Sequence, residues 1–274
     1  MKRTAIIIFL MFLLTASAAG QARINTKRVR IRDFTTRTTK VVLGSNPMLD
    51  AAMQEDIAAR WSISPFEFCD AEEFNALKEN SGYYFLMLTQ SDGIQSLTLF
   101  KGGKESTPDH TGETFDVVSV PLCSSGWSQG REFALLPALI DLIQDFVRSA
   151  MISDKVGYGG IGTCSLGLGK ADGKQVYFDP EDLVGVNETT LERFLGGNLK
   201  MSEDADEVFT EGTPDSLVGF VIAPSSPVRG QICTKMLIDA STHELYWYGR
   251  HRISERKPAG FLPGDIKKFH SAIR

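Results

Sequence analysis

The sharpest candidate for chemistry in this chain is Cys164, in the glycine-rich run GIGTCSLG. Backbone N–H groups of such a turn can form an oxyanion hole, and His243 or His251 could act as the base that activates the thiol. No family signature surrounds this cysteine, and small residues flank cysteines by chance. The sequence therefore leaves open a hydrolase with a distributed site but does not favour one.

The four cysteines lie far apart and contain no CxxC pair, so neither a thioredoxin-like redox motif nor a zinc knuckle is indicated. An oxidising compartment would permit pairing, and four cysteines allow three connectivities. We expect disulfides or buried thiols at Cys69, Cys123, Cys164 and Cys233.

The spacing of histidines and glycines indicates neither a metal nor a nucleotide site, and we expect no cofactor. The chain has no HExxH motif, and eight residues of extended strand would separate His243 from His251 by roughly 26 Å. Gly157-x-Gly159-x-x-Gly162 has the letters of a dinucleotide fingerprint, but a long helix precedes it where the mechanism needs a strand. We interpret these glycines as a flexible connector.

A basic segment near the start is the first candidate for binding. In RVRIR, basic and apolar residues alternate, and period two would place Arg28, Arg30 and Arg32 on one face of a strand. That face could bind anionic lipid, polysaccharide or an acidic partner. Its charges could equally protect an edge strand from aggregation.

Aromatic residues near the end are the second candidate for binding. Alternation along the last strand would place Trp247 on one side and Tyr246 and Tyr248 on the other. One of these faces belongs to the core, and an exposed tyrosine pair could bind sugar or peptide.

The first twenty residues have the layout of a secretory signal peptide. Lys2 and Arg3 are followed by an apolar run, AIIIFLMFLL, and by the small residues TASAAG. About ten apolar residues are too few for a membrane span of about twenty, and no run of eighteen follows later. No cysteine follows the small residues, so we do not expect a lipoprotein. We predict a periplasmic or secreted protein, cleaved near Gly20 or Ala22, with no transmembrane segment after signal removal.

Composition indicates an ordinary globular protein and argues against nucleic acid as a partner. Hydrophobic residues make up 42% and charged residues 23% of the chain, as in typical globular domains. The net charge is −5, and without Lys2 and Arg3 only 27 basic residues face 34 acidic ones. Such a chain lacks the strongly basic surface that nucleic acid rewards.

Alternating helix and strand signals predict an α+β (mixed α/β) protein in two lobes, each a small, mostly antiparallel sheet with helices packed on it. We expect a signal peptide at 1–20, an N-terminal lobe at 21–154 and a C-terminal lobe at 155–274, divided at the glycine-rich segment 155–174. The halves share at most a gross strand–helix plan, because no residue-by-residue alignment of one on the other emerges.

Helix signals are strongest after Asn46, which is a cap followed by proline, after Asp70, and over 133–151, where a wide apolar stripe runs. Shorter helices are expected at 188–195 and 265–273, and the acidic stretch 202–215 is expected to be a loop. The expected strands lie at 41–44, 83–89, 95–101, 115–122, 175–178, 218–223, 231–239 and 245–253. Pro121 favours the end or the edge of its strand.

Several blocks of the sequence resemble a known group of proteins. The run KMLIDASTHELYWYGRH, then AGFLPGDIKKF, resembles the endings of uncharacterised exported proteins of Gram-negative bacteria. The blocks SNPMLDAA, YYFLML, LTLFKGG and ALLPALIDLIQDFV are similar to the same group, so the resemblance spans most of the mature chain. It implies export but no activity and no site residues. Separately, LIDASTHELYWY resembles a hairpin of PepSY-type envelope domains, with Thr242-His243 where a Thr-Gly turn is usual.

Good core patterning without a chemical constellation favours a non-catalytic role. We expect binding or scaffolding in the bacterial cell envelope, with an envelope protein or an anionic polymer as the partner. The alternatives are the hydrolase built on Cys164 and a small-ligand carrier that uses a cleft between the lobes.

Overall fold

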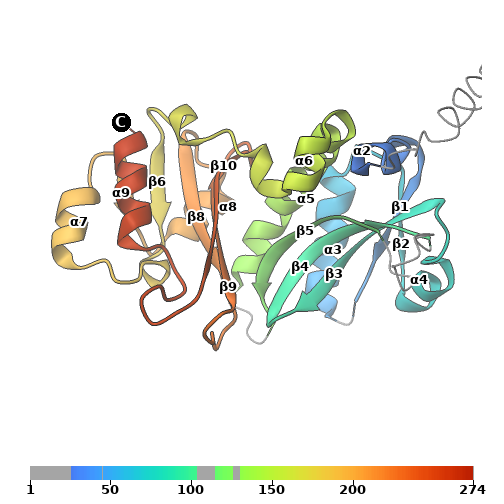
Figure 1. Cartoon of the computed structure of the whole chain (residues 1–274), viewed down its shortest axis with the longest axis horizontal. Helices are drawn as coiled ribbons and strands as arrows, with labels where there is room; N and C mark the ends of the chain where they lie inside the picture. The colour runs from blue at the N-terminus through green and yellow to red at the C-terminus, as the bar shows by residue number, and fades with distance from the viewer. Residues whose placement is uncertain (1–25, 45, 104–114, 126–129, 274) are drawn as a thin grey trace, which may run out of the picture.

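The computed structural model describes residues 26–44, 46–103, 115–125 and 130–273. Two five-stranded sheets flank one long helix, α5 (Arg131–Ile152), which lies between them in the middle of the molecule (Figure 1). This arrangement confirms an α+β fold in two lobes.

The first sheet has the order β2-β1-β3-β4-β5. Its strands are β1 (Thr38–Val42), β2 (Phe66–Cys69), β3 (Tyr83–Ser91), β4 (Ile94–Lys101) and β5 (Phe115–Ser124). The second sheet has the order β10-β9-β8-β6-β7. Its strands are β6 (Gln175–Phe178), β7 (Leu199–Met201), β8 (Ser216–Ile222), β9 (Ile232–Asp239) and β10 (Leu245–Arg252).

Shorter helices precede, connect or follow the strands. They are α2 (Lys27–Arg30), α3 (Pro47–Arg60), α4 (Ala71–Leu77), α6 (Asp154–Gly159), α7 (Glu188–Phe194), α8 (Ala205–Thr210) and α9 (Pro263–Ala272). Four 3₁₀ turns are η1 (Phe34–Thr36), η2 (Ile161–Cys164), η3 (Leu168–Lys170) and η4 (Pro180–Asp182). No helix within the described part of the chain is long and apolar enough to cross a membrane.

The two halves repeat one topology. In each, the first strand pairs in parallel with the next two, and an antiparallel meander of three strands follows. Helices occupy equivalent connections, because α3 and α7 follow the first strand, α4 and α8 the second, and α5 and α9 the last. Each sheet is therefore mixed rather than mostly antiparallel, since helical crossovers join strands that run in the same direction.

Helix α5 is buried on both sides, which explains its wide apolar stripe. One continuous core joins it to α3 and the first sheet, and also to Val218, Phe220, Met236 and Ile238 of the second sheet. The far face of the second sheet packs against α9 in a separate core. Among the helices that the structure describes, α4 packs on the far face of the first sheet. The layers thus run α4, first sheet, α3 with α5, second sheet, α9.

A row of polar residues lies on the face of the first sheet that carries α4. On β3, β4 and β5, the hydroxyls of Thr89, Thr98 and Ser119 form a hydrogen-bonded row at 2.6 and 2.8 Å. The equivalent face of the second sheet carries large apolar side chains and packs against α5. The polarity of the residues on each sheet face therefore depends on the elements that pack against that face.

Several local predictions are confirmed by the structure. Asn46 accepts the N–H groups of Met48 and Leu49, both at 3.2 Å, and thereby caps α3. Asp70 caps α4 through the N–H of Glu73 at 2.8 Å. Strand β5, which contains Pro121, lies at the edge of its sheet.

Two local predictions are wrong. The segment RVRIR is not a strand, because Lys27–Arg30 forms helix α2 and the fully buried Ile31 and Phe34 follow at helical spacing. The acidic stretch contains helix α8, whose Ala205 and Phe209 are buried four residues apart. In both cases the packing of distant elements outweighs the local pattern.

Candidate functional site

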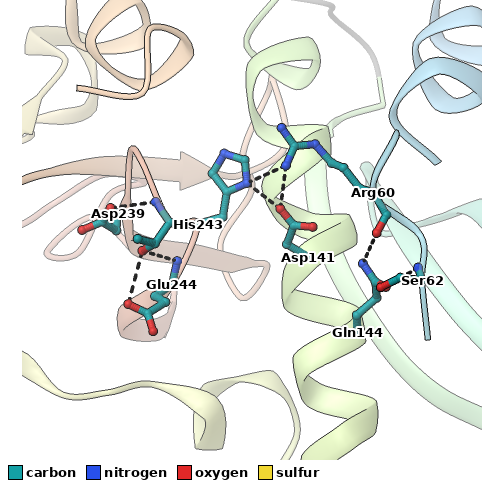
Figure 2. A network of polar contacts seen from close by, with 8 residues as sticks. Arg60, Ser62, Asp141, Gln144, Asp239, His243 and Glu244 are labelled. Atoms are coloured by element: carbon teal, nitrogen blue, oxygen red, sulfur yellow. Dashed lines mark hydrogen bonds and ion pairs between the residues drawn. The ribbon is translucent and has the colours of Figure 1, made fainter. Parts of the chain in front are cut away.

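Polar side chains tie the two lobes together along α5. In the first cluster, Nδ1 of His243 lies 2.7 Å from Oδ2 of Asp141, in the middle of α5 (Figure 2). Nη1 of Arg60, at the end of α3, lies 2.9 Å from the same oxygen. One carboxylate therefore links a helix of the first lobe to the β9–β10 hairpin of the second.

The hairpin conformation sets the position of His243. Asp239 accepts the N–H groups of Ser241 and Thr242 at 3.0 and 2.9 Å, and His243 follows with φ of 59°. This left-handed conformation, usual for glycine, costs a non-glycine residue roughly 1–2 kcal/mol. The ring stacks on Phe209 of α8, with centroids 5.6 Å apart. Packing and the contact with Asp141 hold the ring in place.

The His243–Asp141 pair has a defined chemistry. Because an ionised carboxylate only accepts hydrogen bonds, the Nδ1 of His243 carries the proton that bonds to Asp141. This contact fixes the tautomer and leaves Nε2 available, which is how a carboxylate orients a general base in hydrolases. Here Arg60 shares the same carboxylate oxygen, so the pair also serves as a junction between helices and hairpin.

The thiol of Cys164 is not activated by its surroundings. Burial raises its pKa, and the nearby Asp145 carboxylate raises it further. A nucleophilic cysteine needs the opposite shift, since the thiolate is the reactive form.

All four cysteines are free thiols in the structure. Cys69 and Cys233 are buried, whereas Cys123 and Cys164 are partly exposed. Burial raises the pKa of Cys69 and of Cys123 to about 11 in each case. Cys69 and Cys233 agree with the expectation of buried thiols, whereas Cys123 and Cys164 are free thiols that are only partly buried.

A second cluster ties the lobes at the first turn of α5. Arg131 lies 2.8 Å from Asp182 of η4 and 2.8 Å from Asp206 of α8. Burial raises the pKa of Asp182 to about 6, although Arg131 pulls it down. No spacing in the sequence indicates either cluster, because their members come from distant segments.

A groove of about 390 Å³ lies between β5 and β10. Its walls carry Asp116 and Ser119 from β5, and Tyr248 and Arg250 from β10. Lys27 of α2 and the glycine-rich segment 157–162 complete it. Burial lowers the pKa of Lys27, while Asp116 opposes that shift. The groove thus combines two basic groups, one acidic group and two tyrosines, Tyr158 and Tyr248.

The glycine-rich segment, which we expected to be a flexible connector, forms a packed wall of the groove. Residues 154–164 form α6 and η2, which contact α5 and β10. A Cβ on Gly162 would lie 2.8 Å from Cδ1 of Tyr248, so only glycine allows η2 to approach β10 this closely.

The arginines expected on one strand face are arranged differently. Arg28 pairs with Asp154 of α6, with Nε 3.6 Å from Oδ2. The guanidinium carbon of Arg30 lies 3.5 Å from the centre of the Phe115 ring. Arg32 is exposed beyond the end of α2. The helix spreads these side chains, so the expected one-faced patch is wrong.

The two tyrosines expected on one face, Tyr246 and Tyr248, do not lie on the same face of β10. A bulge between Leu245 and Trp247 breaks the alternation of β10. Tyr246 is only 6% exposed and packs with Trp247 in the core beneath α9. Tyr248 packs on the α5 side and lines the groove. Of the predicted binding tyrosines, Tyr248 alone reaches a candidate site.

The histidines of the described residues do not form a cluster. Nε2 of His251 bonds to the carbonyl of Pro258 at 2.8 Å, and His270 packs edge-on against Phe194. Within the described ranges, no group of three His, Cys, Asp or Glu side chains is placed to hold a metal ion. His110 and the signal-peptide segment lie outside the described residues.

Comparisons with protein-family models, curated proteins and solved structures gave no match. The candidate site therefore stands on its geometry: a groove is lined by residues of both lobes, and separate polar junctions tie the lobes together along α5.

Proposed function

We propose that this protein is a non-catalytic binding protein of the bacterial cell envelope, and that it binds its partner in the groove between β5 and β10. The envelope location comes from the signal-peptide layout of residues 1–20. The groove carries the binding part of the proposal, because charged and aromatic side chains of both lobes line one space there.

The junctions support this role by fixing the walls of the groove. Asp141 ties Arg60 to His243, and Arg131 ties α5 to Asp182 and Asp206. A preformed site avoids the entropic cost of ordering its walls when the partner binds.

The direction of the thiol pKa argues against the rival hydrolase. The raised pKa of Cys164 keeps the thiol protonated at neutral pH and weakens it as a nucleophile. The same groove could suit a small ligand, and the experiment below separates that alternative from a macromolecular partner.

Site-specific photo-crosslinking tests the binding site. Benzoylphenylalanine replaces Tyr158, which is 68% exposed at the groove, or Met48, which is 71% exposed at the start of α3 and serves as the matched control. Irradiation of intact cells is expected to give a higher-mass adduct at position 158 alone. No adduct at 158, or equal adducts at both positions, would contradict a macromolecular partner in the groove.

Fractionation tests the envelope location independently. The processed chain, beginning near residue 21, is expected in the periplasmic or secreted fraction, as measured by intact mass. Recovery of the unprocessed chain in the cytoplasm would overturn this part of the proposal.

A further inference from the structure

The groove exposes the backbone of a strand edge, and register identifies which residues it exposes. In β10, Gly249 pairs with Lys235 and His251 with Cys233 of β9. The N–H of Ile253 bonds to the carbonyl of Gln231 at 2.8 Å. Because directly bonded and non-bonded pairs alternate in an antiparallel ladder, Gly249, His251 and Ile253 bond to β9.

The residues between them must direct their backbone groups away from β9. These are Tyr248 and Arg250, and both line the groove. Among the described residues, no backbone group bonds to the outward N–H or carbonyl of either one. The open edge of β10 therefore faces the groove.

Another segment of the chain already bonds to this same edge of β10, at the residues just before Tyr248. The N–H of Leu166 bonds to the carbonyl of Leu245 at 2.9 Å, and that of Gly167 to the carbonyl of Tyr246 at 3.1 Å. This internal addition stops at Tyr246. Within the described ranges, no segment continues this pairing along the next stretch of the edge.

The opposite edge is a poorer template. The ladder between β4 and β5 is irregular at two places, and Pro121 of β5 has no N–H to donate. Bulges and proline are the devices by which proteins protect edge strands from pairing. Of the two walls, β10 is the one suited to a new strand.

Charge indicates what kind of segment fits. Lys27 and the exposed Arg250 outnumber Asp116 in the groove. Tyr158 and Tyr248 offer aromatic surface to alternate side chains of an extended chain. An acidic side chain in the ligand would pair with Arg250.

We propose that the groove binds an extended, acidic peptide segment of a partner protein, which adds to β10 as a new strand beside Tyr248 and Arg250. This inference rests on the proposed function, since it names the occupant of the same groove. Backbone hydrogen bonds would supply affinity, and Arg250 with the two tyrosines would supply specificity.

The probe is a phage-displayed library of random nonapeptides, panned on the purified protein. Enriched peptides are synthesised with a fluorophore, and their Kd is measured by anisotropy. Arg250→Ala and Arg250→Pro both remove the charge, and only the proline also removes the outward N–H. We expect binding to Arg250→Pro to be about tenfold weaker than to Arg250→Ala. Ser119 lies on the opposite edge, in β5. The Kd of the peptides for Ser119→Pro is therefore expected to equal their Kd for Ser119→Ala.

A second measurement avoids any change to the protein. Peptides N-methylated at single positions are titrated against the native chain, and loss of binding is expected only at alternate positions. This series decides the matter where circular dichroism shows that Arg250→Pro does not fold.

Three results would overturn the inference: no enriched peptide, equal binding to Arg250→Pro and Arg250→Ala, or N-methylation without effect. The inference would also be overturned if the purified protein retained peptidoglycan fragments but no peptide. In each case an adduct at position 158 would still support the proposed function. Absence of that adduct would remove the groove as the binding site altogether.

Discussion

Asp182 is the side chain through which pH is expected to act on the junction between the lobes. It is 8% exposed and bonds to Arg131, whose Nη1 lies 2.8 Å from Oδ2. Burial raises the pKa of Asp182 from 3.8 to about 6 despite this contact. The Asp182→Asn substitution keeps the shape and the acceptor oxygen but removes the titration.

The sign and size of the effect follow from this shift. The folded state holds the proton of Asp182 more tightly than the unfolded state, so its contribution to stability is complete below pH 3.8 and is lost as pH rises through about 6. Each pKa unit corresponds to about 1.4 kcal/mol, so Asp182 lowers the free energy of unfolding by about 2–3 kcal/mol between pH 4 and pH 7.

Urea unfolding of the wild type and of Asp182→Asn at intervals from pH 4 to pH 7 measures this contribution. The difference in unfolding free energy, variant minus wild type, is expected to increase by about 2–3 kcal/mol across that range. Taking the difference cancels groups common to both proteins, including Asp56, whose pKa burial also raises. Val221→Ala, on β8 beside the same junction, is the control without a titratable group.

A difference that stays constant within about 0.5 kcal/mol from pH 4 to pH 7 would refute the reasoning, because Asp182 would then titrate alike in both states. A pH-dependent difference for Val221→Ala would show that groups other than Asp182 also contribute to the pH dependence of the comparison.

Three further predictions concern single positions. Asn46→Ala removes the acceptor of two N–H groups at the start of α3 and is expected to cost about 1 kcal/mol in urea unfolding; a neutral result would contradict the cap. His243→Ala and His243→Gly both lose the contact with Asp141, but only alanine retains the left-handed strain, so the glycine variant is expected to be more stable by about 1 kcal/mol. Equal stabilities would mean that the hairpin relaxes. Cys164 is expected to react with iodoacetamide at pH 8 more slowly than free glutathione, as followed by mass spectrometry, because burial raises its pKa; faster reaction would revive the nucleophile.

Local signals in the sequence were sufficient for most elements. The stripe over 133–151 predicted α5, and the buried positions of the helix include those of the stripe. The caps Asn46 and Asp70 marked the starts of α3 and α4 because a side-chain acceptor there satisfies N–H groups within its own turn. Such signals act over a few residues and need no tertiary contact.

Errors arose where distant residues decide the conformation. Helix α2 forms because Asp154 and Tyr158 of α6 accept the N–H groups of Arg28 and Lys27, more than a hundred residues away. Helix α8 forms because Phe209 packs between Phe220 and His243. Around α8 the composition is acidic, and two apolar residues, Ala205 and Phe209, are too few to indicate a helix by themselves.

The repetition of one topology in both halves was visible in the sequence only as a gross strand–helix plan, without a residue-by-residue alignment. Equivalent positions carry different residues because they face different neighbours. The Thr89–Thr98–Ser119 row lies on the α4 face of the first sheet, and its counterpart on the second is apolar against α5. A shared backbone plan can persist while each face adapts to its own cover.

The candidate site shows the same division. The sequence alone identified Tyr248, the glycines of 157–162 and the hairpin around His243 as unusual, since each is a matter of residue type and local spacing. Only the tertiary structure brought Asp141 to His243, separated Tyr246 from Tyr248 by a bulge, and set the open edge of β10 across a groove from β5. These outcomes depend on packing α5 between two sheets, which is a property of surfaces that meet only after the chain has folded.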